Sequence, residues 1–364
     1  MGISSSLGSS ALLPAGLGFR NLVMNGAMQI SQRGTSTASI TADGYNTADR
    51  WKTDATTLGT WTQSVENDAP TGSEFRKSLK MLCTTADASP AAGDRLAIVQ
   101  SFEGQNVQSI KKGTSSASQL LLTFWVKSNV TGTYIVELFD VDNTRQVSAS
   151  YTVLASATWE KKTIVLPADA TGVFDNDNGE SLAVRFWLGV GSTYSSGTLN
   201  TSWNSNTSAN RAVGQTNLAA ATSNYWQITG VQLEVNLQAT PFEQRPIGVE
   251  LALCQRYYEN SYDNGVAVGT LSATGSTSVI YSGSSGAATG FRFMVRKRVT
   301  PAVRGYPYAT GTNNGVGYWT SASDATNRAV TFGNISPNGM RYVVLTGATV
   351  NSWYEGHYEA DAEL

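Results

Sequence analysis

Short runs in which apolar and polar residues alternate recur along this 364-residue chain from about residue 20 to its end. The clearest runs span residues 120–126, 134–141, 182–190 and 225–235. Side chains of a β-strand point alternately to its two faces, so this spacing predicts strands with one buried face. Clusters of Gly, Ser, Asn and Asp separate the runs, as turns do in antiparallel sheets. Only 14% of the residues are charged, which excludes a coiled coil and a helical bundle.

The length of the chain favours two domains, because a single hydrophobic core stops growing at roughly 250–300 residues. Leu251, Cys254 and Tyr258 follow helical spacing after Pro246, which predicts a short helix between two β regions. The expected order is a Ser- and Gly-rich arm over residues 1–20, an antiparallel β-sandwich over 21–247, a connector helix over 248–260 and a smaller β-sandwich over 261–364.

Charge and hydropathy exclude several classes of partner. With 25 basic and 27 acidic residues, the chain lacks the electrostatic footprint of a protein that binds nucleic acid or an anionic membrane. No apolar stretch approaches the roughly 20 residues that cross a bilayer, so we expect no membrane insertion. Residues 1–18 contain no Lys or Arg and therefore do not resemble a secretory signal. Cys83 and Cys254 are too few for a disulfide framework, which indicates a protein assembled in a reducing cytosol.

Two tryptophans are candidates for ligand binding. Trp125 and Trp187 each lie on the strand face opposite the aliphatic one. Sugars present apolar C–H faces that stack on aromatic rings, and their hydroxyls suit the amide and hydroxyl side chains in which this sequence is rich. The two rings therefore predict glycan binding. The alternative is that they are buried against a second sheet or a second subunit.

Acidic residues suggest two further sites, each with a plain structural alternative. Asp175 and Asp177 lie in an Asp- and Asn-rich segment that is a candidate structural calcium site, although a turn between strands explains it without an ion. His357, the only histidine, alternates with Glu355 and Glu359, which is a candidate metal site or else a solvated strand face. We expect no other cofactor and no catalytic site, because no motif nominates a catalytic pair.

A basic run lies in the second β region. Its members alternate with apolar residues, which favours the outer face of a strand or a subunit contact over phosphate binding. They are Arg292, Arg296, Lys297, Arg298 and Arg304.

A set of motifs distributed over the chain resembles a family of tailed-bacteriophage virion proteins, described as tail fibres or structural proteins. The region between the motifs resembles the jelly rolls of carbohydrate-binding modules, which implies a jelly-roll sandwich over 21–247. The final residues, from about 296 to 364, follow the same family's pattern. The motifs are FRNLVMNGAMQISQRG at 19–34, DRW at 49–51, WQITGVQLEV at 226–235, TPFEQRP at 240–246 and ELALCQRYY at 250–258.

The resemblance implies a non-enzymatic homotrimer that is assembled in the host cytoplasm and located in the virion, on the tail or the capsid surface. In the first hypothesis it is a tail fibre or receptor-binding protein that contacts host-surface glycans. The arm would attach it to other virion proteins through Leu12, Leu13 and Phe19. The alternative is a non-adhesive decoration or adaptor protein. A polysaccharide depolymerase is the third class, against which the absence of β-helical repeats argues.

Overall fold

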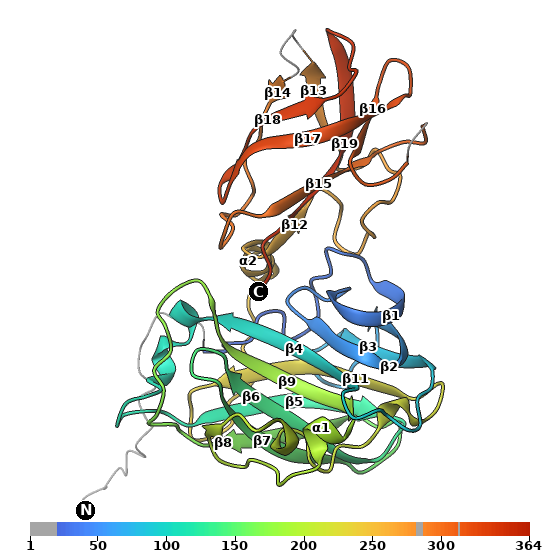
Figure 1. The fold of residues 1–364 in the computed structure, drawn as a ribbon. Coiled ribbons are helices and arrows are strands. Elements are labelled where there is room, and N and C mark those ends of the chain that lie inside the picture. Colours follow the sequence, from blue (N-terminus) through green and yellow to red (C-terminus); the bar gives the residue numbers. More distant parts are fainter. Residues whose placement is uncertain (1–19, 282–286, 312–313) are drawn as a thin grey trace, which may run out of the picture.

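The computed structural model describes residues 20–281, 287–311 and 314–364, and in these ranges the chain is mainly β, as predicted. Two β units stack end to end, with helix α2 between them (Figure 1). We call strands β1–β11 the first sandwich and strands β12–β19 the second sandwich. Leu12, Leu13 and Phe19, predicted to attach the protein to the virion, lie outside the described residues.

The first sandwich contains eleven strands and several short helices. Its strands are β1 Ser36–Tyr45, β2 Lys52–Glu66, β3 Ser78–Thr85, β4 Arg95–Glu103, β5 Leu120–Ser128, β6 Gly132–Asp140, β7 Arg145–Val153, β8 Glu160–Leu166, β9 Glu180–Val190, β10 Asn204–Ser205 and β11 Tyr225–Glu234. Its short helices are η1 Gly104–Asn106, η2 Gln108–Ile110, α1 Ser192–Ser195, η3 Ser208–Asn210 and η4 Leu218–Ala220.

The second sandwich is smaller and follows the one longer helix among the described residues. Its elements are α2 Ile247–Gln255, β12 Tyr258–Asn260, β13 Thr277–Tyr281, β14 Ala287–Thr289, β15 Ala302–Pro307, β16 Tyr318–Ser321, β17 Asn327–Ser336, β18 Gly339–Leu345 and β19 Ser352–Asp361.

The eleven strands of the first sandwich form one hydrogen-bonded sheet that folds back on itself. The order is β10-β7-β6-β9-β4-β2-β3-β11-β5-β8, with β1 paired to β2. The first half of β2 pairs with β4 and its second half with β3. Between the halves, Thr57 and Gly59 adopt positive φ angles of 51° and 65°, which bend the strand from one layer into the other. The result is two layers that share β2.

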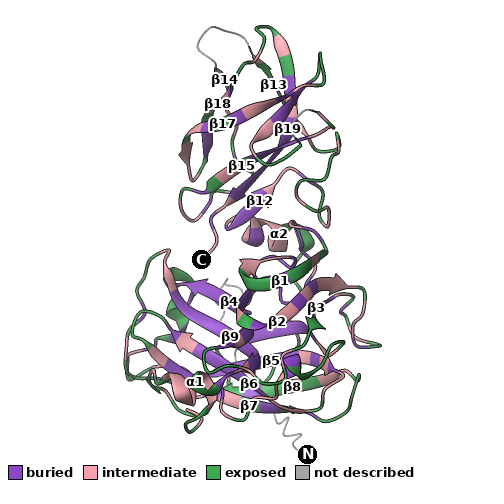
Figure 2. Cartoon of the chain, turned by 45° about the vertical axis from the view of Figure 1, so that its right-hand side comes forward, coloured by how far each residue is buried: buried purple, intermediate pink, exposed green. Residues whose placement is uncertain are grey.

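The core of the first sandwich lies between these layers, in purple in Figure 2. Phe124 from β5 packs edge-on against Phe186 from β9, with ring centroids 5.1 Å apart. Phe186 also contacts Trp226 from β11. Phe124 and Phe186 belong to the apolar faces that the alternation predicted, and every other residue of β5 from Leu120 to Val126 is buried in the same core.

Helix α2 is shorter than the predicted connector. It ends at Gln255, because Tyr258–Asn260 pair with the end of β19 instead of continuing the helix. Tyr258 to Asn260 thus belong to the second sheet, where Tyr258 is fully buried. In the described part of the chain, no helix has both the length and the apolar character needed to cross a membrane.

Strand β19 lies in the middle of the second sheet, which corrects the prediction of a solvated charged face. It pairs with β12, β13, β15 and β16. His357 is fully buried, and Glu359 is nearly so. The Glu359 carboxylate accepts hydrogen bonds from the hydroxyls of Tyr258 and Tyr306 at 2.8 and 2.7 Å. His357 and Glu359 are therefore internal and hydrogen-bonded, and they do not protect an edge.

Two hydrogen bonds fix the orientation and the tautomer of the buried His357 ring. Its Nε2 lies 2.8 Å from the carbonyl oxygen of Ser272, to which only a protonated nitrogen can donate. Its Nδ1 lies 2.9 Å from Oγ of Ser261, whose hydroxyl donates to it. The ring also stacks on Tyr262, with centroids 3.7 Å apart. Burial lowers the pKa of His357 below 6.5 and outweighs the opposite effect of the bond to Ser272.

We expect acid to destabilise the second sandwich through His357. The folded state binds the imidazole proton less tightly than the unfolded state, so a neutral His357 stabilises the folded protein. This contribution to the free energy of unfolding is complete above pH 6.5. It is lost as the pH falls from 6.5 through the lower pKa of the folded state. Urea denaturation at about pH 7 and about pH 5 measures the loss. A His357→Gln variant should lose less stability over the same interval, and an equal loss in both proteins would contradict the assignment.

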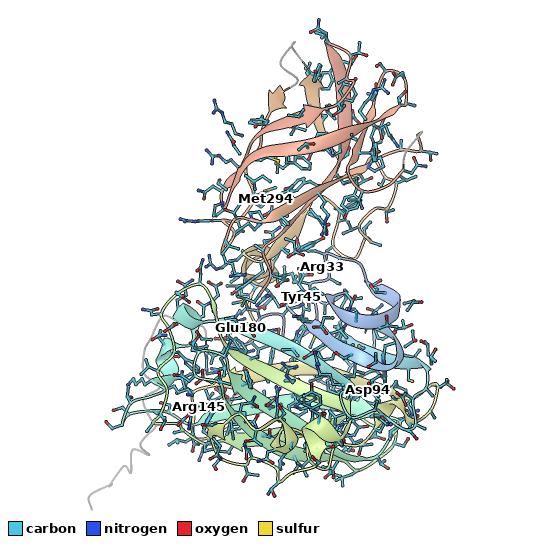
Figure 3. All side chains as sticks on the ribbon, in the orientation of Figure 1. Arg33, Tyr45, Asp94, Arg145, Glu180 and Met294 are labelled. Atoms are coloured by element: carbon cyan, nitrogen blue, oxygen red, sulfur yellow. The ribbon has the colours of Figure 1, made fainter. Side chains whose placement is uncertain are left out.

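A charged cluster joins the two sandwiches at the point where the chain ends. Glu363 forms ion pairs with Arg33 and Arg50. The guanidinium groups of these two arginines stack on Tyr258 and Tyr257, each 3.5 Å from the ring centroid. Figure 3 shows Arg33 at the junction between the sandwiches. Because the partners come from both units, the cluster fixes one sandwich against the other.

The sequence motifs that carry the family resemblance meet beside this junction. The Glu243 carboxylate accepts the backbone N–H groups of Arg20 and Asn21 at 3.0 and 2.9 Å. The Asn21 side chain bonds to β11, donating to the carbonyl of Val231 and accepting the N–H of Leu233. Three distant segments are thus held together by the buried Asn21 and the partly buried Glu243. Their role in this structure is to organise the fold.

Candidate functional site

The two tryptophans singled out from the sequence have different environments. Trp187 in β9 has no exposed surface, because the segment of residues 191–217 covers the outer face of its layer. Its ring lies 5.5 Å from that of Tyr194, and the guanidinium groups of Arg185 and Arg211 each lie 5.2 Å from it. A ring without exposed surface cannot stack on a sugar. The prediction for Trp187 is therefore wrong, and this residue belongs to the core.

The acidic turn before β9 is held by hydrogen bonds within the protein, including two between Asn178 and Arg298 of the second sandwich. The Asp177 carboxylate accepts the N–H of Gly179 at 2.8 Å, and the N–H of Asp175 donates to Asp142 at 2.9 Å. Both predicted calcium ligands are exposed. Among the described residues, no three His, Cys, Asp or Glu side chains are grouped so that they could hold a metal ion. The calcium prediction gains no support from the structure.

Trp125 lies on the outer face of the other layer and is partly exposed. Strand β5 lies between β8 and β11, and Trp125 is paired with Lys161 in β8 and with Thr229 in β11. Directly after Thr229, the pairing of β11 with β5 shifts register, which marks a β-bulge at Gly230. The partly exposed ring of Trp125 therefore lies next to the β-bulge at Gly230.

A groove of about 400 Å³ opens at this bulge. The rings of Phe75 and Phe242 meet edge to face along one wall, with centroids 4.9 Å apart. Gly230 has a φ of 63°, and a Cβ atom there would lie 2.5 Å from Phe75, so this position requires glycine. The residues that line the groove are Glu74, Phe75, Thr123, Trp125, Lys161, Gly230, Ala239, Thr240, Pro241 and Phe242.

The polar groups of the groove include both acceptors and donors. Glu74 and Lys161 are exposed, and their side chains form no ion pair with other described residues. Thr240 is partly exposed, and its hydroxyl lies 2.8–2.9 Å from the Glu234 carboxylate oxygens. A carboxylate, an ammonium group and an indole around one depression can together bind hydroxyl groups and an apolar ring face.

A second indole continues the same face. Trp159 directly precedes β8 and is partly exposed, and Nζ of Lys127 in β5 lies 5.1 Å from its ring centroid. Lys161 is directly opposite Trp125, and Trp159 is two residues before Lys161 in the chain. Trp159 is therefore a diagonal neighbour of Trp125 on the same face. Side chains in this diagonal relation are roughly 7–8 Å apart. We call Trp125, Trp159, Lys127, Lys161 and Gln227 the tryptophan face.

Asp68 holds the tryptophan face in place. Its carboxylate accepts hydrogen bonds from the Trp159 indole at 3.2 Å and from the Gln227 amide at 3.1 Å, and it pairs with Lys127. Burial alone would raise the pKa of Asp68, but these hydrogen bonds outweigh it and keep the pKa below its usual value. A carboxyl group that stays ionised in this way positions its neighbours. A glycosidase acid needs the opposite shift.

The sequence analysis missed Trp159, Phe242 and Glu74. For Trp159 a signal was available, because Trp159, Lys161 and Thr163 alternate with Ile164 and Leu166 on the other face. Phe242 and Glu74 lie in loops and reach the groove only through the fold, so no periodicity identifies them.

Comparisons with known proteins give structural similarity at low identity. No family model matches the sequence, and no curated protein matches it. The enzymatically active domain of tailspike protein 4 from bacteriophage CBA120 is 15% identical with a TM-score of 0.31, over 60% of this chain and 22% of that one. A family 61 carbohydrate-binding module in complex with β-1,4-galactotriose is 10% identical with a TM-score of 0.29, over 60% and 100%. The family 22 xylan-binding domain of Paenibacillus barcinonensis Xyn10C is 9% identical with a TM-score of 0.27, over 60% and 96%.

Proposed function

We propose that this chain is a non-catalytic glycan-binding protein that uses the groove beside Trp125. The observation that carries the proposal is the exposure of Trp125 and Trp159 on one sheet face, next to a groove with unpaired polar groups. A folded protein gains nothing in stability from exposed indole surface, whereas a sugar ring stacked on it buries apolar area on both partners.

The biological setting in this proposal is a bacteriophage virion. The motifs of residues 19–34 and 226–258 resemble virion proteins of tailed bacteriophages, and a tail fibre or receptor-binding protein needs a surface that recognises host glycans. A homotrimer would present three such faces, and multivalent contact raises a weak single-site affinity through effective concentration. Attachment to other virion proteins would place these faces outward.

A decoration or adaptor protein is the second candidate function. The observation that favours it is an apolar groove of about 620 Å³ at the edge strand β8, lined in part by Pro167, Val235 and Leu237. Leu237 is 77% exposed, and Val165 on β8 is 55% exposed. Exposed aliphatic side chains at a sheet edge suit contact with another subunit.

A panel of immobilised saccharides distinguishes the two candidates. We expect the purified full chain to bind a subset of neutral oligosaccharides, with competition by the same sugar in solution. Binding of virion proteins without binding of any saccharide or host cell would instead support the decoration protein. Release of shorter saccharides from a bound polymer would contradict the non-catalytic assignment.

A further inference from the structure

Another groove lies on the second sandwich, far from Trp125 in the sequence. It has a volume of about 440 Å³ and is lined by residues of β17, β18 and the segment that follows β14. Figure 1 shows these strands in the second sandwich. Arg292, Arg341 and Asn334 are its exposed polar side chains. Two residues beyond Arg292, Met294 is 81% exposed, which shows that this side of the segment faces outward (Figure 3).

The register of the strands places both arginines on the outer face. Residues 290–292 continue the pairing of β14 with β18, so that Gly290 is opposite Arg341, and Arg292 is opposite Gly339. Between these pairs, Phe291 packs against the core and Met340 is buried in it. Side chains alternate along a strand, so Arg292 and Arg341 point away from the core as diagonal neighbours.

Glycine opposite each arginine hollows the floor of the groove. A Cβ atom at Gly290 would lie 2.0 Å from the carbonyl oxygen of Met340, and one at Gly339 would lie 2.4 Å from that of Phe291. Gly339 also has a φ of 147°, which an L-residue rarely adopts. Any other residue at these positions would push the strands apart, so backbone forms the floor and the guanidinium groups form the rim.

The charge of this groove is not neutralised by the protein. Within the described residues, neither Arg292 nor Arg341 forms an ion pair, although most other arginines of the chain do. No acidic residue lines the groove. On β17, Asn334 lies between Gly333, which is opposite Tyr342, and Ile335, which is opposite Met340, so its position is directly across from Arg341. Opposite residues of an antiparallel pair share a face of the sheet, which places the Asn334 amide beside Arg341. Two guanidinium forks and an amide present donors to one depression.

We propose that this groove binds a carboxylate-bearing saccharide, such as a uronic acid residue of an acidic polysaccharide. Guanidinium groups bind carboxylates through two parallel hydrogen bonds, and the amide of Asn334 suits a sugar hydroxyl. The inference deepens the proposed glycan-binding function by adding a separate site with its own ligand class.

Calorimetric titration of the full chain tests this site with trigalacturonate and with its fully methyl-esterified form, which has the same sugar skeleton without charge. We expect trigalacturonate to bind and the ester to bind at least about tenfold more weakly. Arg292→Gln and Arg341→Gln should each weaken trigalacturonate binding by a similar factor. Arg296→Gln is the matched control, because Arg296 is exposed in the same segment but does not line the groove.

Other results would overturn the proposed acidic-saccharide site. Equal affinity for acid and ester, or equal affinity in the arginine variants and the control, would overturn it while leaving Trp125-dependent binding of neutral sugars intact. Competition by inorganic phosphate at the same concentration as trigalacturonate would show a general anion site and would also overturn it. Loss of trigalacturonate binding in Trp125→Ala alone would assign the acid to the tryptophan face. Binding of no saccharide at either site would overturn both proposals together.

Discussion

Replacing Glu363 by glutamine is expected to lower the free energy of unfolding by about 3–5 kcal/mol. The Glu363 side chain is only 5% exposed, and it pairs with Arg33 and Arg50, whose side chains are 9% and 1% exposed. Without the negative charge of Glu363, the ion pairs no longer offset the free energy that it costs to bury the charged Arg33 and Arg50 side chains. Because these residues join the two sandwiches, we also expect the unmodified protein to unfold in one thermal transition and the variant to unfold in two.

Scanning calorimetry measures both effects of the Glu363→Gln substitution. Glu355→Gln is the matched control, since Glu355 lies in β19 and is partly exposed, with no ion pair to the described residues. The control should change stability by no more than about 0.5 kcal/mol. Equal stability of the two variants would show that the charged cluster does not hold the sandwiches together.

Replacing Trp125 by alanine is expected to weaken saccharide binding by roughly 30-fold, equivalent to about 2 kcal/mol, with little loss of stability. The ring is partly exposed on the outer face of β5, so its removal costs contact with a ligand more than contact with the core. Titration with a saccharide identified by the panel gives the affinity, and thermal unfolding gives the stability.

Trp187→Ala is the matched comparison for this prediction. Because Trp187 is fully buried, its truncation should cost about 3–5 kcal/mol of stability. At a temperature where the variant remains folded, its saccharide affinity should be unchanged. If Trp125→Ala instead destabilises the protein as strongly as Trp187→Ala, the ring is part of the core and the proposed site is wrong.

Local sequence patterns predicted the strands and their buried faces well. In β5 the period of two separates Phe124 from Trp125 correctly, because the direction of a side chain depends only on its position in the strand. The same rule placed Trp187 opposite the main core but did not show that residues 191–217 return to cover it. Burial of an outer face depends on such long-range packing.

Long-range packing also explains the two largest differences between the sequence expectations and the structure. Alternating charges in 354–364 are typical of a wet strand face, yet Glu359 is buried because Tyr258 and Tyr306 donate to it from neighbouring strands. The tryptophan face depends on the pairing of β5 with β8, which places Trp159 beside Lys127. Neither pairing is encoded in the local pattern of one segment.

Titration of the isotope-labelled protein with a bound saccharide, followed through the indole N–H resonances, tests the central claim most directly. Trp125→Phe and Trp159→Phe identify the two resonances of the tryptophan face. The proposal predicts that these two shift with a common saturation curve, while the resonances of the fully buried Trp51, Trp61, Trp187 and Trp226 stay in place. Saturable binding that leaves Trp125 and Trp159 unshifted would contradict it.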